Sequence, residues 1–296
     1  MSTFAVLTDS TCDFPQELLD KYQIDYAPMN YTIGMENYPA LLDWSIHSPK
    51  EFYDFMRAGT IIKTTQVPAT EFEKHFTSSL EQGKDVLYIS CSSALSGSIN
   101  IARMVAKELA SKYPDRTIYC LDSLISSLGQ GYLVIKAAAL RDEGLSVTDA
   151  AAWIESMKLK VNQFATVGSL EFLRRAGRVT AASSFFGNFL GIKPILISDK
   201  IGQNYAIKKV KGAANVRTEI ANMVQETVEH PEEQTLYISH ADAIDDANAM
   251  RDTILKNVAF KDCFINNIAP IVGASVGPGM IGVYCVGKEV TIEGGN

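Results

Sequence analysis

The chain begins its first recognisable element at Phe4-Ala5-Val6-Leu7, an apolar run that passes directly into Thr8-Asp9-Ser10-Thr11. A short apolar run bounded by polar residues is typical of a buried strand. Asp13 and Pro15 follow, and this order of a capping residue and an early proline predicts a helix over Gln16–Tyr22. A strand that leads through a polar turn into a helix is half of a βαβ unit. This stretch therefore predicts an α/β fold.

The same pattern continues through the first half of the chain. It predicts further strands over 25–33, 61–63, 86–89 and 117–121, and helices over 49–57, 69–82, 98–113, 129–143 and 146–158. Alternating strands and helices indicate a Rossmann-like parallel sheet with flanking helices. Three apolar runs end in hydroxyl or carboxylate groups, in the stretches TDST, SCSS and DS. Ligands of open parallel sheets bind beyond the carboxyl ends of the strands, so these groups predict a site at that edge.

The second half has a different pattern. It predicts strands over 164–167, 236–239, 264–269 and 280–286, helices over 170–178, 181–192, 213–228 and 245–258, and a hairpin of 194–198 with 205–210. Gly273–Gly279 is interpreted as a tight loop between two strands. Hairpins combined with crossovers predict a mixed sheet. Since 296 residues suggest about two domains, we expect an N-terminal α/β domain over 1–160 and a C-terminal α/β domain over 161–296, with the ligand between them.

Composition excludes several classes of protein. The formal net charge is -7, whereas a general nucleic-acid binder needs a net basic field, so we expect no nucleic-acid partner. The N-terminal residues lack the pattern of a secretion signal, and no run approaches the ~20 apolar residues of a membrane span. The five cysteines are scattered, and the four histidines have no ligand spacing with them. We therefore expect a cytoplasmic protein with reduced thiols and no metal.

Two hydroxyl-rich segments are the strongest candidates for an anion site. Lys63–Pro68 places Thr64 and Thr65 between a strand and a helix, where they could equally be capping residues. Ser90–Ser98 holds five serines in nine residues before a helix, more than one cap requires. With Gly97 permitting close approach of the backbone, the surplus suits an anion held by hydroxyls, amide N–H groups and the helix dipole.

Two alternatives remain at this point. Ser96 could be a hydrolase nucleophile, although the nucleophile elbow would need glycines where Ala94 and Ser98 stand. The segment 185–192, with Phe185, Phe186, Phe189, Leu190 and Ile192, either fills an interdomain core or lines a tunnel for a hydrocarbon chain. Burial of a ~16-carbon chain would contribute roughly 12 kcal/mol before the costs of association.

Further polar groups could serve the same ligand. Arg174, Arg175 and Arg178 form the densest basic cluster, which is either a solvated helix face or a contact for a phosphate or a partner. Gly273–Gly279 lacks the Lys-Ser/Thr ending of a phosphate-binding P-loop, but its Ser275 could donate to a head group.

Five motifs in this order resemble the DegV family, which includes the fatty-acid-binding (FakB-like) subunits of bacterial fatty acid kinase. They are Thr8–Thr11 (T-D-S-[ST]), Lys63–Pro68 (K-T-S-Q-P), Ser92–Ser98 (S-S-x-L-S-G-T), Leu170–Val179 (L-x-x-L-x-x-G-G-R-I) and Gly277–Gly279 (G-P-G). The departures are Ala176 in place of a glycine, Ser275 near the position of a family histidine, and smaller differences at Thr65 and Val67. We expect Ser275 or a water to take the place of that imidazole.

The resemblance implies a two-domain protein that encloses one long-chain fatty acid, such as palmitate, stearate or oleate, and has no cofactor. It implies that Thr64 and Ser96 hold the carboxylate, with Thr65, Gly97 and Ser275 as helpers. Arg178 is then linked to the acyl phosphate or to the kinase subunit. The chain would be a substrate-presenting carrier in contact with a separate kinase and, transiently, with membrane surfaces. The alternatives are a serine-dependent lipid or ester hydrolase, a phosphotransfer protein like dihydroxyacetone kinase, and a regulatory protein with a structural lipid.

Overall fold

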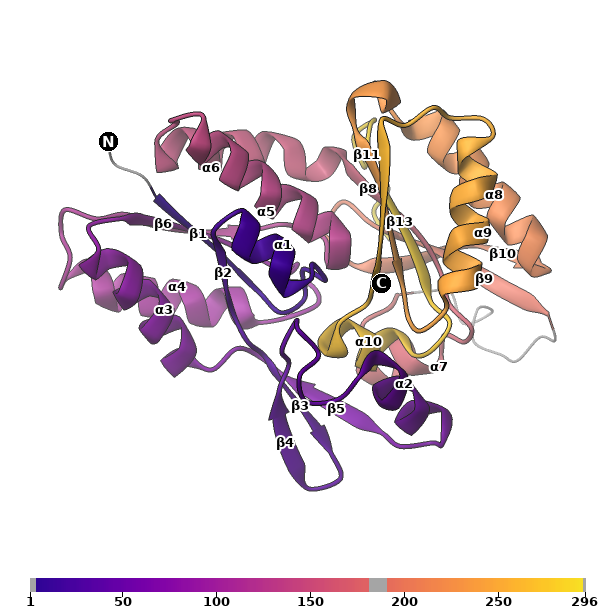
Figure 1. Ribbon diagram of the computed structural model, residues 1–296, viewed down its shortest axis with the longest axis horizontal. Coiled ribbons are helices and arrows are strands. Elements are labelled where there is room, and N and C mark those ends of the chain that lie inside the picture. The colour runs from indigo at the N-terminus through magenta and orange to yellow at the C-terminus, as the bar shows by residue number, and fades with distance from the viewer. Residues whose placement is uncertain (1–3, 181–190, 295–296) are drawn as a thin grey trace.

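The computed structural model describes residues 4–180 and 191–294 and confirms an α/β fold with one parallel and one mixed sheet (Figure 1). The first sheet has the order β2-β1-β6-β7 and is parallel throughout. Its strands are β1 (Phe4–Asp9), β2 (Ile24–Ala27), β6 (Asp85–Ser90) and β7 (Ile118–Asp122).

Helices cover both faces of this parallel sheet. They are α1 (Gln16–Lys21), α3 (Ala69–Glu81), α4 (Ser98–Ala110), α5 (Ser127–Asp142) and α6 (Val147–Met157). Alternate residues of β6 separate the two faces: Val86 and Tyr88 pack with α3 and α4, whereas Leu87 and Ile89 pack with α5 and α6. This two-sided burial explains why the strands are continuous apolar runs.

The mixed sheet has the order β10-β9-β8-β13-β11-β12, in which only β11 and β12 are parallel neighbours. Its strands are β8 (Val161–Thr166), β9 (Ile192–Ser198), β10 (Asn204–Lys211), β11 (Thr235–His240), β12 (Asp262–Asn267) and β13 (Ile281–Val286). The predicted hairpin is formed by β9 and β10. Helices α8 (Ala213–Thr227) and α9 (Ile244–Leu255) cover one face, and short 3₁₀ turns lie at Lys158–Lys160 and Pro231–Glu233.

A third sheet corrects the prediction of one strand over 25–33. Pro28 separates β2 from β3 (Asn30–Ile33), and β3 pairs antiparallel with β4 (Glu36–Pro39) and β5 (Ile62–Thr65). Proline has no N–H to donate to a ladder, so the chain leaves the parallel sheet there. Helix α2 (Pro49–Arg57) follows β4 and begins with a capping box of Ser48 and Glu51.

The loop predicted over Gly273–Gly279 was also wrong. Helix α10 (Pro270–Val276) occupies most of it and ends at Gly277, whose φ is 76°. Proline at the first helical position favours this start, and packing outweighs the low helix propensity of Gly273. Helix α10 packs against α7 (Glu171–Ala176) and β5.

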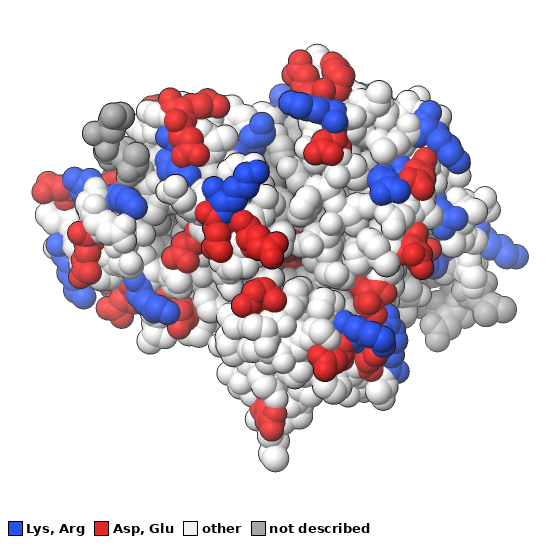
Figure 2. All heavy atoms as spheres, viewed as in Figure 1, with Lys and Arg blue, Asp and Glu red and all other residues white. Residues whose placement is uncertain are grey.

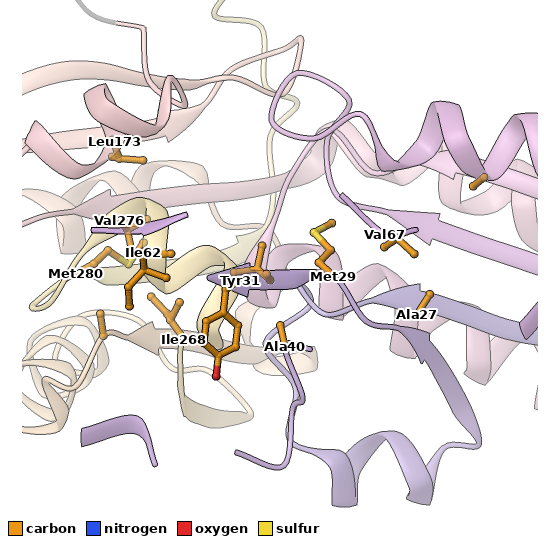
Figure 3. Packing of buried hydrophobic residues seen from close by; sticks show 14 of the residues in the cluster. Ala27, Met29, Tyr31, Ala40, Ile62, Val67, Leu173, Ile268, Val276 and Met280 are labelled. Carbon is orange, nitrogen blue, oxygen red and sulfur yellow. The ribbon is translucent and has the colours of Figure 1, made fainter. Parts of the chain in front are cut away.

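The third sheet shares a hydrophobic core with the second half of the chain. Tyr31 and Ile62 belong to the same buried cluster as Ile268, Val276 and Met280, and Figure 3 shows Ile62 beside the last two. The hydroxyl of Tyr53 donates a hydrogen bond to the carbonyl oxygen of Ile268 at 2.7 Å. The domain boundary at residue 160 remains a prediction. Residues 30–65 precede it in sequence, but they contact residues that precede it and residues that follow it.

Asp13 joins the two halves through buried hydrogen bonds. Its Oδ1 accepts from the backbone N–H of Ala269 at 2.9 Å, and its Oδ2 accepts from the hydroxyl of Ser127. Its carbonyl oxygen accepts from Nδ2 of Asn266 at 2.6 Å. Burial raises the pKa of Asp13 to about 8, which outweighs the opposing effect of the hydrogen bonds from Ser127 and Ala269.

We expect this carboxyl group to make stability depend on pH. Its pKa is about 8 in the folded state and about 4 in an unfolded chain. The folded protein therefore binds the proton more tightly, and its stabilising effect, complete below about pH 4, is lost as the pH rises toward 8. Asp13→Asn should remove the part of this pH dependence that comes from Asp13. The free energy of unfolding in urea, measured at several pH values between about 4 and 8, tests this. The exposed Asp115 provides the control, since Asp115→Asn should retain the wild-type dependence.

Asp13→Ala leaves the N–H of Ala269 without its acceptor, and should lower the free energy of unfolding by about 1–3 kcal/mol. An Asp13→Asn variant with the full wild-type pH dependence would show that Asp13 is not the group responsible.

Candidate functional site

The predicted polar residues gather around one cavity. It has a volume of about 310 Å³, and Thr64, Thr65, Ser96, Arg178 and Ser275 all line it. They come from four separate parts of the fold: β5, the loop before α4, the segment after α7, and α10. The cavity therefore lies where the carboxyl edge of the parallel sheet meets the mixed sheet.

A hydrogen-bond chain connects the two hydroxyl-rich segments. The backbone N–H of Val67 donates to Oγ of Ser98 at 3.1 Å. The hydroxyls of Ser98 and Ser96 are 3.0 Å apart, and the backbone N–H of Ser98 donates to Oγ of Ser96 at 3.3 Å. If Ser98 donates its hydroxyl proton to Ser96, the proton of Ser96 is free to point into the cavity. Sequence reasoning did not identify Ser98 as the link.

Gly97 lies beside the cavity, in close contact with Gln66. It is absent from the described lining of the cavity and is the N-cap of α4. A Cβ atom at Gly97 would lie 2.4 Å from Nε2 of Gln66. Gln66 itself lines the cavity and was not predicted, because a single glutamine in a loop gives no signal.

Arg178 is held at the cavity by its neighbours in the fold. Gly177 ends α7 in the left-handed region, with φ 69°, where glycine avoids the cost of a Cβ atom. The chain then turns so that Nε of Arg178 donates to the carbonyl oxygen of Leu95 at 2.9 Å. The guanidinium thus contacts the same loop that carries Ser96. Ser275 lies on α10, with its hydroxyl 3.5 Å from the carbonyl oxygen of Ile271.

The rest of the wall is largely apolar. Among its residues are Met29, Ala165, Val167, Leu196, Val276 and Met280. Burial raises the pKa of the Cys91 thiol well above its usual value, so this lining side chain is uncharged. All five cysteines are free.

The predicted acyl-chain segment lies mostly outside the described residues, which omit Phe185, Phe186, Phe189 and Leu190. Ile192, predicted at the end of a helix, is the first residue of β9, and it is not among the described residues lining this cavity. The apolar wall that the structure describes comes instead from several elements, with Ala165 on β8, Leu196 on β9 and Val276 on α10.

A second cavity of about 330 Å³ adjoins the first and shares Thr64, Arg178 and Ser275 with it. Lys63 and Arg175 add positive charge to its wall. These shared residues mark the end of the first cavity that faces the second, and an anion there would be close to several cations.

Within residues 4–180 and 191–294, no cluster of side chains is suited to hold a metal ion. In the same ranges, no helix has the length and apolar character needed to cross a membrane.

Comparisons with known proteins identify the family and agree with the fold. Residues 3–288 match the family model described as "Uncharacterised protein, DegV family COG1307". The DegV domain-containing protein CPE0026 of Clostridium perfringens is 32% identical, with 97% of this chain and 98% of that one covered.

Two solved structures are similar over nearly their whole length. A DegV family protein from Thermus thermophilus, described as binding fatty acid, has a TM-score of 0.86 and 27% identity, with 97% of this chain and 100% of that one covered. DegV of Bacillus subtilis, described as a fatty acid binding protein, has a TM-score of 0.82 and 26% identity, with 97% and 100% covered.

The contact between Gly97 and Gln66 can be tested by a double-mutant cycle. The φ of Gly97 is -80°, which alanine adopts without strain, so Gly97→Ala introduces only the clash with Gln66. Gln66 is exposed and its flexible side chain can move aside, so we expect a loss of at most about 0.5 kcal/mol in the free energy of unfolding. Adding Gln66→Ala should recover most of the loss, as measured by urea unfolding of the four proteins. If the effects of the two substitutions on the free energy of unfolding simply add, the two residues are not in contact.

Proposed function

The chain belongs to the DegV family, and we propose that it binds one long-chain fatty acid in the 310 Å³ cavity and presents the carboxylate to a separate kinase. The observation that carries this proposal is the convergence of Thr64, Ser96, Ser275 and Arg178 on a cavity whose remaining wall is mostly apolar. An amphiphile with one small anionic end fits such a lining. The T. thermophilus and B. subtilis relatives described as binding fatty acid support the ligand class.

Neutral donors are enough for a carboxylate head group. Hydroxyls of Thr64, Ser96 and Ser275 can each donate to a carboxylate oxygen, with Thr65 at the rim. Ser96 and Gly97 directly precede α4, so the partial positive charge of that helix start favours an anion. In this proposal the acyl chain lies against the apolar wall.

The second cavity is the proposed route to the kinase. It contains Lys63, Arg175 and the shared Arg178, which together suit the phosphate groups that must approach the carboxylate. The ATP chemistry belongs to the kinase subunit in this proposal, and the present chain acts as a carrier in the cytoplasm without a cofactor of its own.

A serine hydrolase is the main alternative, with Ser96 as nucleophile. The lining residues that the structure describes include no histidine, the usual base for such a serine. Release of product from a chromogenic acyl ester, abolished by Ser96→Ala, would support the hydrolase over the carrier. A phosphotransfer protein like dihydroxyacetone kinase would instead need a nucleotide site, which ATP-binding measurements on this chain alone would detect.

Fatty-acid binding is tested by native mass spectrometry of the purified protein, followed by lipid extraction and uptake of labelled oleate. Ser96→Ala should weaken binding by about 1–3 kcal/mol, because a buried carboxylate oxygen loses its donor. Ser93→Ala is the matched control, since Ser93 is an exposed residue of the same loop outside the described lining. Absence of any fatty acid together with no uptake of oleate would reject the proposed function.

The kinase step is tested with the catalytic subunit of a bacterial fatty acid kinase, ATP and the loaded protein, with the acyl phosphate trapped as its hydroxamate. Arg178→Ala should reduce formation of the product at least tenfold while oleate remains bound. Arg174→Ala is the control, because Arg174 pairs with Glu171 and is absent from the described lining of both cavities. Equal rates for the two variants would exclude a specific role for Arg178.

A further inference from the structure

The wall formed by the mixed sheet carries a polar row. Tyr284 of β13 is paired with Gln163 of β8, and Asn204 of β10 is paired with Ser198 of β9. Nε2 of Gln163 donates to Oδ1 of Asn204 at 3.0 Å, which joins the two pairs. Tyr284, Gln163 and Asn204 all line the cavity.

The next row on the same face is apolar. Ala165 lies two residues after Gln163 on β8, and Leu196 lies two residues before Ser198 on the antiparallel β9. The two are paired with each other, and both line the cavity. Residues two apart share a face of a strand, so the wall changes from polar to apolar within about 7 Å. An acyl chain alone would need only the apolar part.

The hydrogen bonds of Asn204 determine which atom of Gln163 is available. Nδ2 of Asn204 donates to the carbonyl oxygen of Arg178 at 3.1 Å, so Oδ1 is the atom that accepts from Gln163. Gln163 must therefore use its amide nitrogen there. Its Oε1, an acceptor, makes no hydrogen bond to any residue that the structure describes, although Gln163 is only 4% exposed.

Ser126 provides the second unused group. It is 8% exposed, lines the cavity, and its hydroxyl makes no hydrogen bond within the described chain. The loop before it is fixed to the polar row, because Oγ of Ser198 donates to the carbonyl oxygen of Leu124 at 2.9 Å. Buried polar groups in native proteins nearly always have partners. Here the partner, a ligand or a water molecule, has to come from within the cavity.

These groups line only the first cavity, and Asn204 links Gln163 to the backbone carbonyl oxygen of Arg178. Thr64, Arg178 and Ser275 also line the second cavity, whereas Ser126 and Gln163 line only the first. Gln163 lies on β8, and the apolar Val167 directly follows that strand. The two residues are four positions apart, which corresponds to about 13 Å along an extended chain. The first cavity therefore has a polar inner wall in addition to its polar mouth.

We propose that the fatty acid bound by this protein carries a hydroxyl group on its chain, which donates to Oε1 of Gln163 and accepts from the hydroxyl of Ser126. A hydroxyl fits because Oε1 needs a donor, which a keto group or a double bond lacks. This inference rests on the proposed function and specifies its substrate class. An unsubstituted chain leaves both protein groups unpaired, so the hydroxylated acid should bind about tenfold more tightly.

The test compares acids that differ only by a hydroxyl. Delipidated protein is titrated in competition with a fluorescent fatty acid, using oleate against ricinoleate, and stearate against α-hydroxystearate and β-hydroxystearate. We expect one hydroxylated acid to exceed its unsubstituted match about tenfold. Ser126→Ala should reduce this preference, and Gln163→Leu should remove or reverse it, because leucine offers an apolar contact of similar size.

Ser93→Ala is the matched control. Ser93 is exposed and absent from the described lining of the cavity, so the preference should remain. Equal binding of all hydroxylated and unsubstituted acids by the wild type would overturn the inference and leave fatty-acid binding intact. Failure of every acid to bind would overturn the proposed function and this inference with it.

Discussion

The buried carboxyl group of Asp13 is the contact on which the arrangement of the site depends. It lies after β1 and is hydrogen-bonded both to Ser127, the first residue of α5, and to Ala269, directly before α10. Helix α10 in turn carries Ser275 to the cavity. A buried polar network of this kind is stabilising only when all its members are paired. One side chain thus fixes the relative position of the parallel sheet and of a helix from the other half.

The hydrogen bond between Val67 and Ser98 likewise fixes the relative position of the two hydroxyl-rich segments. The chain has a formal net charge of -7, whereas its proposed ligand is an anion. On the face in Figure 2, acidic and basic side chains are interspersed, with no single-sign field. A local set of hydroxyls at a helix start needs no such field, because its donors act at hydrogen-bond distance.

The sequence was sufficient for the parallel sheet and the β9–β10 hairpin, since each has a local signal at a strand or helix end. The common site of Thr64, Ser96 and Arg178 was expected only from the family resemblance, and all three line one cavity. It was insufficient where tertiary packing decides. Helix α10 was obscured by glycines, and the third sheet by strands of only four residues after Pro28. Gln163 was missed because its role depends on its hydrogen bond to Asn204, which is 41 residues away in sequence.

Hydroxyl donors also suit a carrier better than an ion pair would. Nε of Arg178 is bonded to the carbonyl oxygen of Leu95, so the guanidinium is directed partly by the protein rather than wholly by the ligand. A buried bidentate arginine would hold a carboxylate strongly and would draw charge from the oxygen that must attack a phosphate. Neutral hydroxyls bind the carboxylate more weakly and leave more charge on that oxygen. If the proposed function is right, a buried chain combined with a modestly held head group would suit transfer of the carboxylate to a kinase.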